Sequence, residues 1–154
     1  MDATTLKELA RASFRLIETG DEQLARQIID PDFTNHEAED DPDDAERQLK
    51  GPAGFLATGV WLRDAFSELH FELREVAVDG PTVMAASVMT GRHTGTFLGV
   101  PATGRAFSQQ QVHIFTTADS QITAHRAVRD DLSLLLQLGW RPGRGVAGDT
   151  GSNR

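Results

Sequence analysis

Polar and aromatic side chains alternate along residues 106–116 and 121–129, the pattern of two β-strands. A tight turn at Ala118-Asp119 that pairs Thr117 with Ser120 would join them as a hairpin. Alternation then places these residues on one face: Phe107, Gln109, Gln111, His113 and Phe115 opposite Ile122, Ala124, Arg126, Val128 and Asp130. That face is too polar for a core and too aromatic for a surface, so we expect it to line a small-molecule pocket, with its glutamines and phenylalanines as substrate contacts.

Asp130 is the residue on this face best suited to acid/base chemistry. A carboxylate in a partly apolar cavity loses hydration, which disfavours its ionised form and suits a general acid/base working near neutral pH. Asp130 also stands where a helix begins, so the alternative is that it only caps that helix, a role Asp131 could take instead.

Arg126 and His113 are further candidates on the same face. Arg126 could bind a carboxylate, phenolate or enolate oxygen of a ligand, or lie at the rim with its guanidinium in water. His113 fits a hydrogen-bonded structural histidine better than a proton carrier, and it is the second candidate for catalysis. The other histidines considered, His36, His93 and His125, lack helical metal-ligand spacing, so we expect no metal site.

The elements that must position this face follow from periodicity. Apolar residues at three- and four-residue spacing predict helices over 2–19, 21–30 and 52–67, and a short helix follows at 131–138. An extended piece is expected at 33–36, and strands over 69–79, 82–94, 106–116 and 121–129, the first bulged near Glu75. This order predicts an α+β fold in which N-terminal helices and a curved antiparallel sheet form a cone with an internal cavity. We expect one domain over 1–139 and a disordered tail over 140–154.

The run at 37–46 holds acids on both sides of Pro42. Like-charge repulsion favours a solvated loop there over the alternative, a cation or partner site.

Composition narrows the function classes. The chain has 154 residues, a net charge of −8 and no cysteine, which excludes disulfides, zinc-thiolate sites and a cysteine nucleophile. Its basic residues are scattered, which argues against a nucleic-acid partner. No apolar stretch approaches the ~20 residues of a membrane helix, and the N-terminus lacks a signal core, so we expect no membrane partner and a cytoplasmic protein.

Four segments together resemble the SnoaL-like polyketide cyclase family, within the nuclear-transport-factor-2-like superfamily. They are TNHE at 34–37, GPAGFLATGVWLRDAF at 51–66, GRHTGTFLGVPATGR at 91–105 and HRAVRDDLSLLLQLG at 125–139. The resemblance implies a cofactor-free cavity enzyme in which one Asp, matched by Asp130, shuttles a proton during an intramolecular aldol ring closure of a polyketide. It also makes Asn35, His36, Phe55 and His93 candidate substrate contacts.

The sequence departs from this family on the predicted pocket face, where Ala124 and Arg126 replace the family's Glu and Trp. Two alternatives to a cyclase therefore stay open: a hydrolase or hydroxylase-accessory enzyme on a related molecule, and a binding protein without catalysis. The opposite face of the sheet, with Val112, Ile114 and Ala127, predicts a homodimer or larger homo-oligomer.

Overall fold

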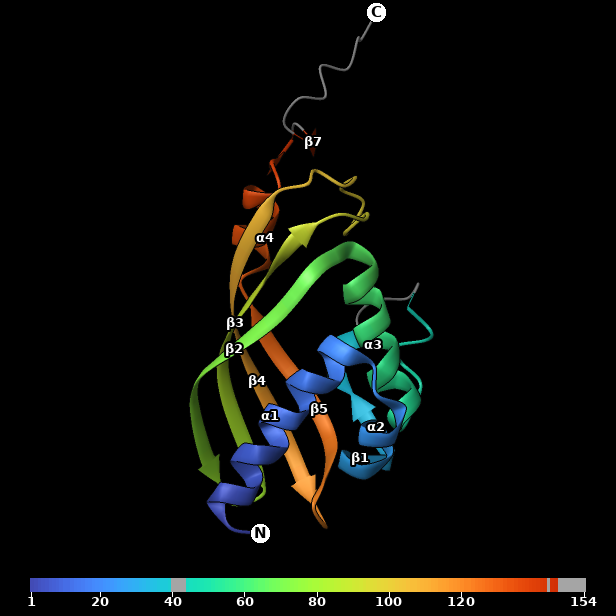
Figure 1. Ribbon diagram of the computed structural model, residues 1–154, viewed down its shortest axis with the longest axis vertical. Coiled ribbons are helices and arrows are strands. Elements are labelled where there is room, and N and C mark those ends of the chain that lie inside the picture. Colours follow the sequence, from blue (N-terminus) through green and yellow to red (C-terminus); the bar gives the residue numbers. More distant parts are fainter. Residues whose placement is uncertain (40–43, 144, 147–154) are drawn as a thin grey trace, which may run out of the picture.

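The computed structural model describes residues 1–39, 44–143 and 145–146. Helices come first: α1 (Ala3–Thr19) and α2 (Glu22–Ile28), then strand β1 (Ile29–Asn35), a short 3-10 helix η1 (His36–Ala38) and α3 (Pro52–Ala65). Four long strands follow: β2 (Phe66–Asp79), β3 (Thr82–His93), β4 (Ala106–Ala118) and β5 (Gln121–Arg129). Helix α4 (Asp131–Gln137) closes the domain (Figure 1).

The strands form one curved five-stranded sheet in the order β1-β5-β4-β3-β2 (Figure 1). Neighbours from β2 to β5 are antiparallel, as predicted, whereas β1 joins the edge parallel to β5, with Asn35 opposite His125. The α+β class is confirmed. The parallel edge matters for the site because it brings residues from the beginning of the chain beside the last long strand.

Local signals explain where the helices begin and end. The Asp2 carboxylate accepts from the Thr5 N–H at 2.8 Å and caps α1, and Gly20 ends that helix in the left-handed conformation at φ 68°. Asp21 caps α2 by accepting from the N–H groups of Gln23 and Leu24 at 2.9 and 3.0 Å. Both N-caps lie at the first residue of a predicted helix, 2–19 and 21–30.

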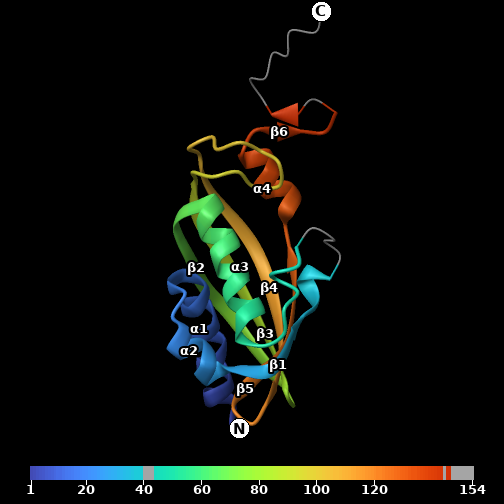
Figure 2. The same cartoon turned by 90° about the vertical axis from the view of Figure 1, so that its right-hand side faces the viewer.

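Helices α1 and α3 lie against the concave side of the sheet (Figure 2). Their apolar stripes meet the sheet in one core, which contains the fully buried Leu16, Phe33, Phe66 and Phe115. Irregularities in the β2–β3 pairing at Ser67/His70 and at Leu73/Glu75 accompany the bend of the sheet. The second of these is the predicted bulge near Glu75.

Beyond α4 the chain makes a short hairpin, β6 (Trp140–Arg141) and β7 (Gly145–Val146). The predicted disordered tail thus begins with this hairpin, and its residues 144 and 147–154 lie outside the described residues. Within the part of the chain that the structure describes, no helix is long and apolar enough to cross a membrane.

The acidic run does not behave as one solvated loop. Glu37 lies in η1 with only 8% of its side chain exposed, so the prediction is wrong for this residue. It is also wrong for Asp44, whose side chain is 13% exposed and forms an ion pair with Arg47. Glu39 and Glu46 are exposed, as predicted, and residues 40–43 lie outside the described residues.

Candidate active site

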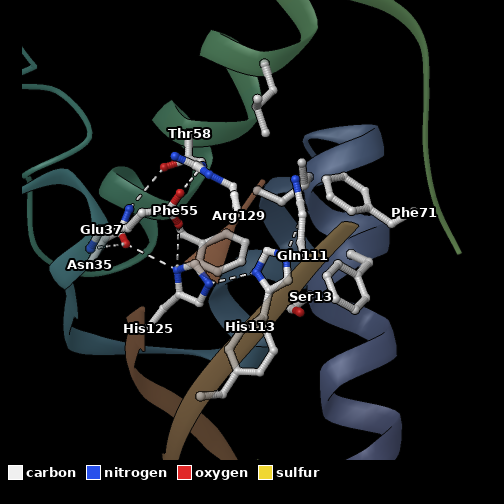
Figure 3. Close-up of a pocket in the computed structure, with 14 residues that line it drawn as sticks. Ser13, Asn35, Glu37, Phe55, Thr58, Phe71, Gln111, His113, His125 and Arg129 are labelled. Atoms are coloured by element: carbon white, nitrogen blue, oxygen red, sulfur yellow. Dashed lines mark hydrogen bonds and ion pairs between the residues drawn. The ribbon is translucent and has the colours of Figure 1, made fainter. Parts of the chain in front are cut away.

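A pocket lies between the concave face of the sheet and the helices α1 and α3 (Figure 3). It holds about 450 Å³ of space free of atoms, part of which is open to solvent. Most of its wall is apolar, contributed by Phe14, Ile17, Phe55, Leu62, Phe71 and Phe115. A wall of this kind suits a flat, mostly apolar ligand that a few polar groups orient.

Two histidines stand side by side in the wall. His113 of β4 and His125 of β5 stack with ring centroids 5.2 Å apart, and Nδ1 of His113 lies 2.9 Å from Nε2 of His125. Nε2 of His113 lies 2.7 Å from Oε1 of Gln111, and Nδ1 of His125 lies 3.2 Å from Oδ1 of Asn35 (Figure 3). Every ring nitrogen of the pair therefore faces a polar atom.

Burial controls the protonation of this pair. It lowers the pKa of His113 to about 4, because the charged ring would lose its hydration. Burial likewise lowers the pKa of His125 well below its usual range, and the charges of His113 and His36 lower it further. Both rings are therefore neutral at neutral pH and able to accept a proton.

Charged groups close the pocket on the β5 side. Glu37 forms an ion pair with Arg129, whose guanidinium Nε also lies 3.5 Å from Oδ1 of Asp131. The second carboxylate oxygen of Glu37 lies 3.6 Å from Nδ1 of His125. Burial lowers the pKa of Arg129, and Asp131 raises it. Arg129 is thus the cation that balances the buried Glu37.

A β-bulge decides which β5 residues face the pocket. The turn is at Asp119-Ser120, one residue later than predicted, and both residues have positive φ. Pairing begins with Ala118 opposite Gln121, and Thr123 is then skipped, so that Thr116 pairs with Ala124. One extra residue reverses the alternation for the rest of the strand.

Several predicted positions are wrong for this reason. Beyond the bulge, His125 and Arg129 point into the pocket, while Arg126 and Val128 point to the opposite, exposed face. The Arg126 side chain therefore points away from this pocket, and its predicted place on the pocket face is wrong. Ala127 pairs with His113 and shares its inner face, so it does not belong to the outer face on which it was predicted.

Asp130 also lies outside the pocket. It is exposed, and its carboxylate accepts from the Ser133 N–H at 3.1 Å as the N-cap of α4. Its backbone N–H donates to the Gln110 carbonyl at 3.2 Å. The predicted place of Asp130 on the pocket face is wrong, and the alternative capping position is the one observed.

The other sequence candidates divide into two groups. Four predicted contacts line the pocket together with His113: Asn35, Phe55, Gln111 and Phe115. Gln109 is buried next to the pocket, where its Oε1 accepts a hydrogen bond from Nε2 of Gln111. The remaining three lie elsewhere. His36 is exposed beside Glu39, His93 is buried against Thr103, and Phe107 packs on Phe66.

Sequence reasoning missed three pocket residues that carry much of its polarity: His125, Glu37 and Arg129. Glu37 was assigned to a solvated acidic run. Its position two residues after Asn35, a predicted substrate contact, was the sequence feature that could have placed it near the pocket. The other two depend on the bulge, which no local pattern indicated. Among the described residues, no group of three or more His, Asp or Glu side chains is arranged to hold a metal ion.

Comparisons with known proteins agree with this architecture. The family model described as SnoaL-like polyketide cyclase matches residues 7–138. The chain belongs to this family. The chain is 36% identical over 149 residues to the aklanonic acid methyl ester cyclase DnrD of Streptomyces peucetius, covering 90% of this chain and 99% of the relative. It is also 36% identical over 135 residues to the nogalonic acid methyl ester cyclase of Streptomyces nogalater, covering 80% and 96%.

Solved structures share the fold of this polyketide cyclase family member. TsrD from Streptomyces laurentii superposes with a TM-score of 0.78 at 26% identity, over 90% of this chain and 98% of that one. A SnoaL-like polyketide cyclase from Jannaschia sp. CCS1, described as putative, gives a TM-score of 0.73 at 25% identity, over 90% and 94%. The cone-shaped arrangement of sheet and helices is therefore that of the family.

Proposed function

We propose that this polyketide cyclase closes a carbon ring in the methyl ester of an aromatic polyketide acid by intramolecular aldol addition. Two relatives that match most of the chain are named for the methyl esters of aklanonic and nogalonic acid, which supports an ester substrate. The phenylalanine-rich wall of the pocket supports a flat aromatic one.

The His113–His125 pair is the proposed acid/base group. The observation that carries this assignment is that both rings line the pocket, are neutral near neutral pH and are bonded to each other at 2.9 Å. The pair takes the proton from the carbon next to the ester carbonyl. The carbon's electron pair attacks a ketone of the same molecule, and the proton returns to the alkoxide oxygen.

Turnover of aklanonic acid methyl ester and nogalonic acid methyl ester tests the assignment. Product and substrate have equal mass in a ring closure, so chromatography separates them and mass spectrometry confirms isomerisation. His113→Gln and His125→Gln should each lower kcat by about 10²–10⁴-fold, the usual loss for a positioned acid/base group. Arg126→Gln changes a side chain on the exposed face, away from the pocket, and is the matched control. Its kcat should stay within about threefold of the wild-type value, because surface substitutions usually change free energies by about 0.5 kcal/mol or less.

Other products would identify other functions. A carboxylic acid product, lighter than the ester and released together with methanol, would indicate hydrolysis of the ester. Tight binding of both esters without conversion would indicate a binding protein. Full turnover by both histidine variants would remove the pair from the mechanism. A homo-oligomeric state and a cytoplasmic location belong to the same proposal. The exposed Val112 and Val128 support the first, and the similarity to biosynthetic cyclases supports the second.

A further inference from the structure

The polar groups of the pocket form one continuous chain of hydrogen bonds. At one end, Nε2 of Gln109 donates to Oδ1 of Asp131 at 2.8 Å. Nε2 of Gln111 donates to Oε1 of Gln109 at 2.7 Å, and Oε1 of Gln111 accepts from Nε2 of His113 at 2.7 Å. Because Asp131 can only accept, these contacts fix which end of each amide is nitrogen, and they place the His113 proton on Nε2.

The other end of this hydrogen-bonded series also faces acceptors, the side-chain oxygens of Asn35 and Glu37. Nδ1 of His113 has no proton, so it accepts from Nε2 of His125, and Nδ1 of His125 is then left with a lone pair. That lone pair faces Oδ1 of Asn35 at 3.2 Å and Oε2 of Glu37 at 3.6 Å. Oδ1 of Asn35 is fixed as an oxygen because it accepts from the Glu37 N–H at 3.2 Å, while Nδ2 donates to Oγ1 of Thr58 at 3.3 Å.

Counting hydrogens shows that the chain is one proton short. Each of its four inner groups, two glutamines and two neutral histidines, offers one donor and one acceptor along the chain, and acceptors stand at both ends. With acceptors at both ends, one contact must lack a hydrogen, and the amide orientations place the gap at Nδ1 of His125. A single added proton completes every contact.

We propose that Glu37 is a positioning residue of the ring closure: it keeps this gap open and, acting through His125, holds the proton taken from the substrate. The inference rests on the proposed function. The substrate C–H bond breaks, its electron pair forms the new C–C bond, and the proton occupies the gap between Nδ1 of His125 and the oxygens of Glu37 and Asn35. It then passes to the alkoxide oxygen, so the enzyme is unchanged after each turnover.

The surrounding charges favour this uptake. Glu37 and Asp131 contribute two negative charges and Arg129 one positive charge, which sum to −1, and the transferred proton brings the sum to zero. His36 stands on the same short helix as Glu37 but points to solvent and pairs with Glu39 at 2.7 Å. Helices α1 and α3 line the pocket with Ser13, Thr58 and apolar side chains, none of which titrates. Burial of both rings opposes protonation, and the charges of His113 and His36 also lower the pKa of His125.

Two substitutions should move the proton affinity of the histidine pair in opposite directions. Glu37→Gln removes the carboxylate and supplies an amide N–H that can fill the gap, so the pair should bind a proton less readily. Asn35→Asp puts a carboxylate oxygen 3.2 Å from Nδ1 of His125, so the pair should bind a proton more readily. A charge at such a distance shifts a pKa by about one unit or more.

Histidine ¹⁵N chemical shifts of the substrate-free protein, recorded from pH 8 down to pH 4, measure this directly. The wild-type pair should begin to take up a proton as the pH approaches about 4, to which burial lowers the pKa of His113. Asn35→Asp should show the same uptake about one pH unit higher, and Glu37→Gln should show none in the range. Asp130→Asn removes a carboxylate that takes no part in this series of hydrogen bonds. It is the control, and its histidines should titrate as those of the wild type do.

Turnover supplies the second readout. Glu37→Gln should lower kcat by about 10- to 100-fold with KM little changed, and the acidic limb of the rate profile should move to lower pH because the pair is a weaker base. Glu37→Asp keeps the charge and should recover part of the loss.

Identical histidine titrations in the wild type, Glu37→Gln and Asn35→Asp would overturn the inference, as would a shift of both variants in the same direction. If Glu37→Gln does not fold, Asn35→Asp alone tests the inference. A histidine titration of Asn35→Asp at the wild-type pH would then refute the inference. The titration needs no substrate. A wild-type protein inactive on both esters but with the expected titrations would therefore contradict the proposed function and leave the proton gap established.

Discussion

Acidification should destabilise the fold through the buried histidine pair. Burial lowers the pKa of His113 from 6.5 to about 4, so the unfolded chain binds this proton more tightly than the folded one. The stabilising contribution is therefore complete above pH 6.5 and is lost as the pH falls toward 4. A shift of about 2.5 units corresponds to about 3 kcal/mol at 1.36 kcal/mol per unit, and the lowered pKa of His125 acts in the same direction.

Urea unfolding at pH 7.5 and pH 4.5 measures this loss. In His113→Gln, whose side chain at this position does not titrate, the free energy of unfolding should fall less between these pH values than in the wild type, by about 2–3 kcal/mol. For a domain of this size that is about 4–12 °C in the melting temperature. His70→Gln removes an exposed histidine and serves as the control. Equal losses in the wild type and His113→Gln would refute the reasoning.

Three further predictions concern the buried ion pair of the pocket, the N-cap of α4 and the exposed face of the sheet. Arg129→Met leaves the carboxylate of Glu37, 8% exposed, without its cation and should cost about 3 kcal/mol in urea unfolding. Adding Glu37→Gln should recover most of that cost, and a double variant no more stable than the single one would contradict the pairing. Asp130→Asn should keep both the melting temperature, because Asn caps a helix about as well as Asp, and turnover within a few-fold. A large loss of turnover would return Asp130 to the mechanism. Light scattering should give a mass at least twice the 16.8 kDa of one chain, and Val128→Glu, at a side chain that is 70% exposed, should lower it.

Much of the fold follows from local sequence. The helices begin and end close to the predicted positions, and the carboxylates of Asp2 and Asp21 cap the first two. Strict alternation along β4 sends Gln111, His113 and Phe115 to the pocket, as the sequence predicted. These features depend on neighbours within a few residues, so a single sequence contains the information that fixes them.

The identity of the polar groups around His113 depended on tertiary structure. Because the turn at Asp119-Ser120 lies one residue later than predicted, the partners across the hairpin shift by two residues, which leaves Ile122 on the inner face. The single residue skipped at Thr123 then moves every later β5 side chain to the opposite face. The bulge near Glu75 could be predicted because the apolar positions of that strand change from odd to even numbers, whereas no such change marks Thr123. Only the pairing of β5 with β4 shows the second bulge.

The last component of the site came from the opposite end of the chain. Parallel pairing of β1 with β5 placed Asn35 opposite His125, 90 residues later, and thereby brought the Glu37 carboxylate to the histidine pair. The sequence by itself determined the family, the helices, the four long strands and one wall of the pocket. Only the packing of distant segments decided which carboxylate that pocket contains, because burial and charge pairing arise when those segments meet.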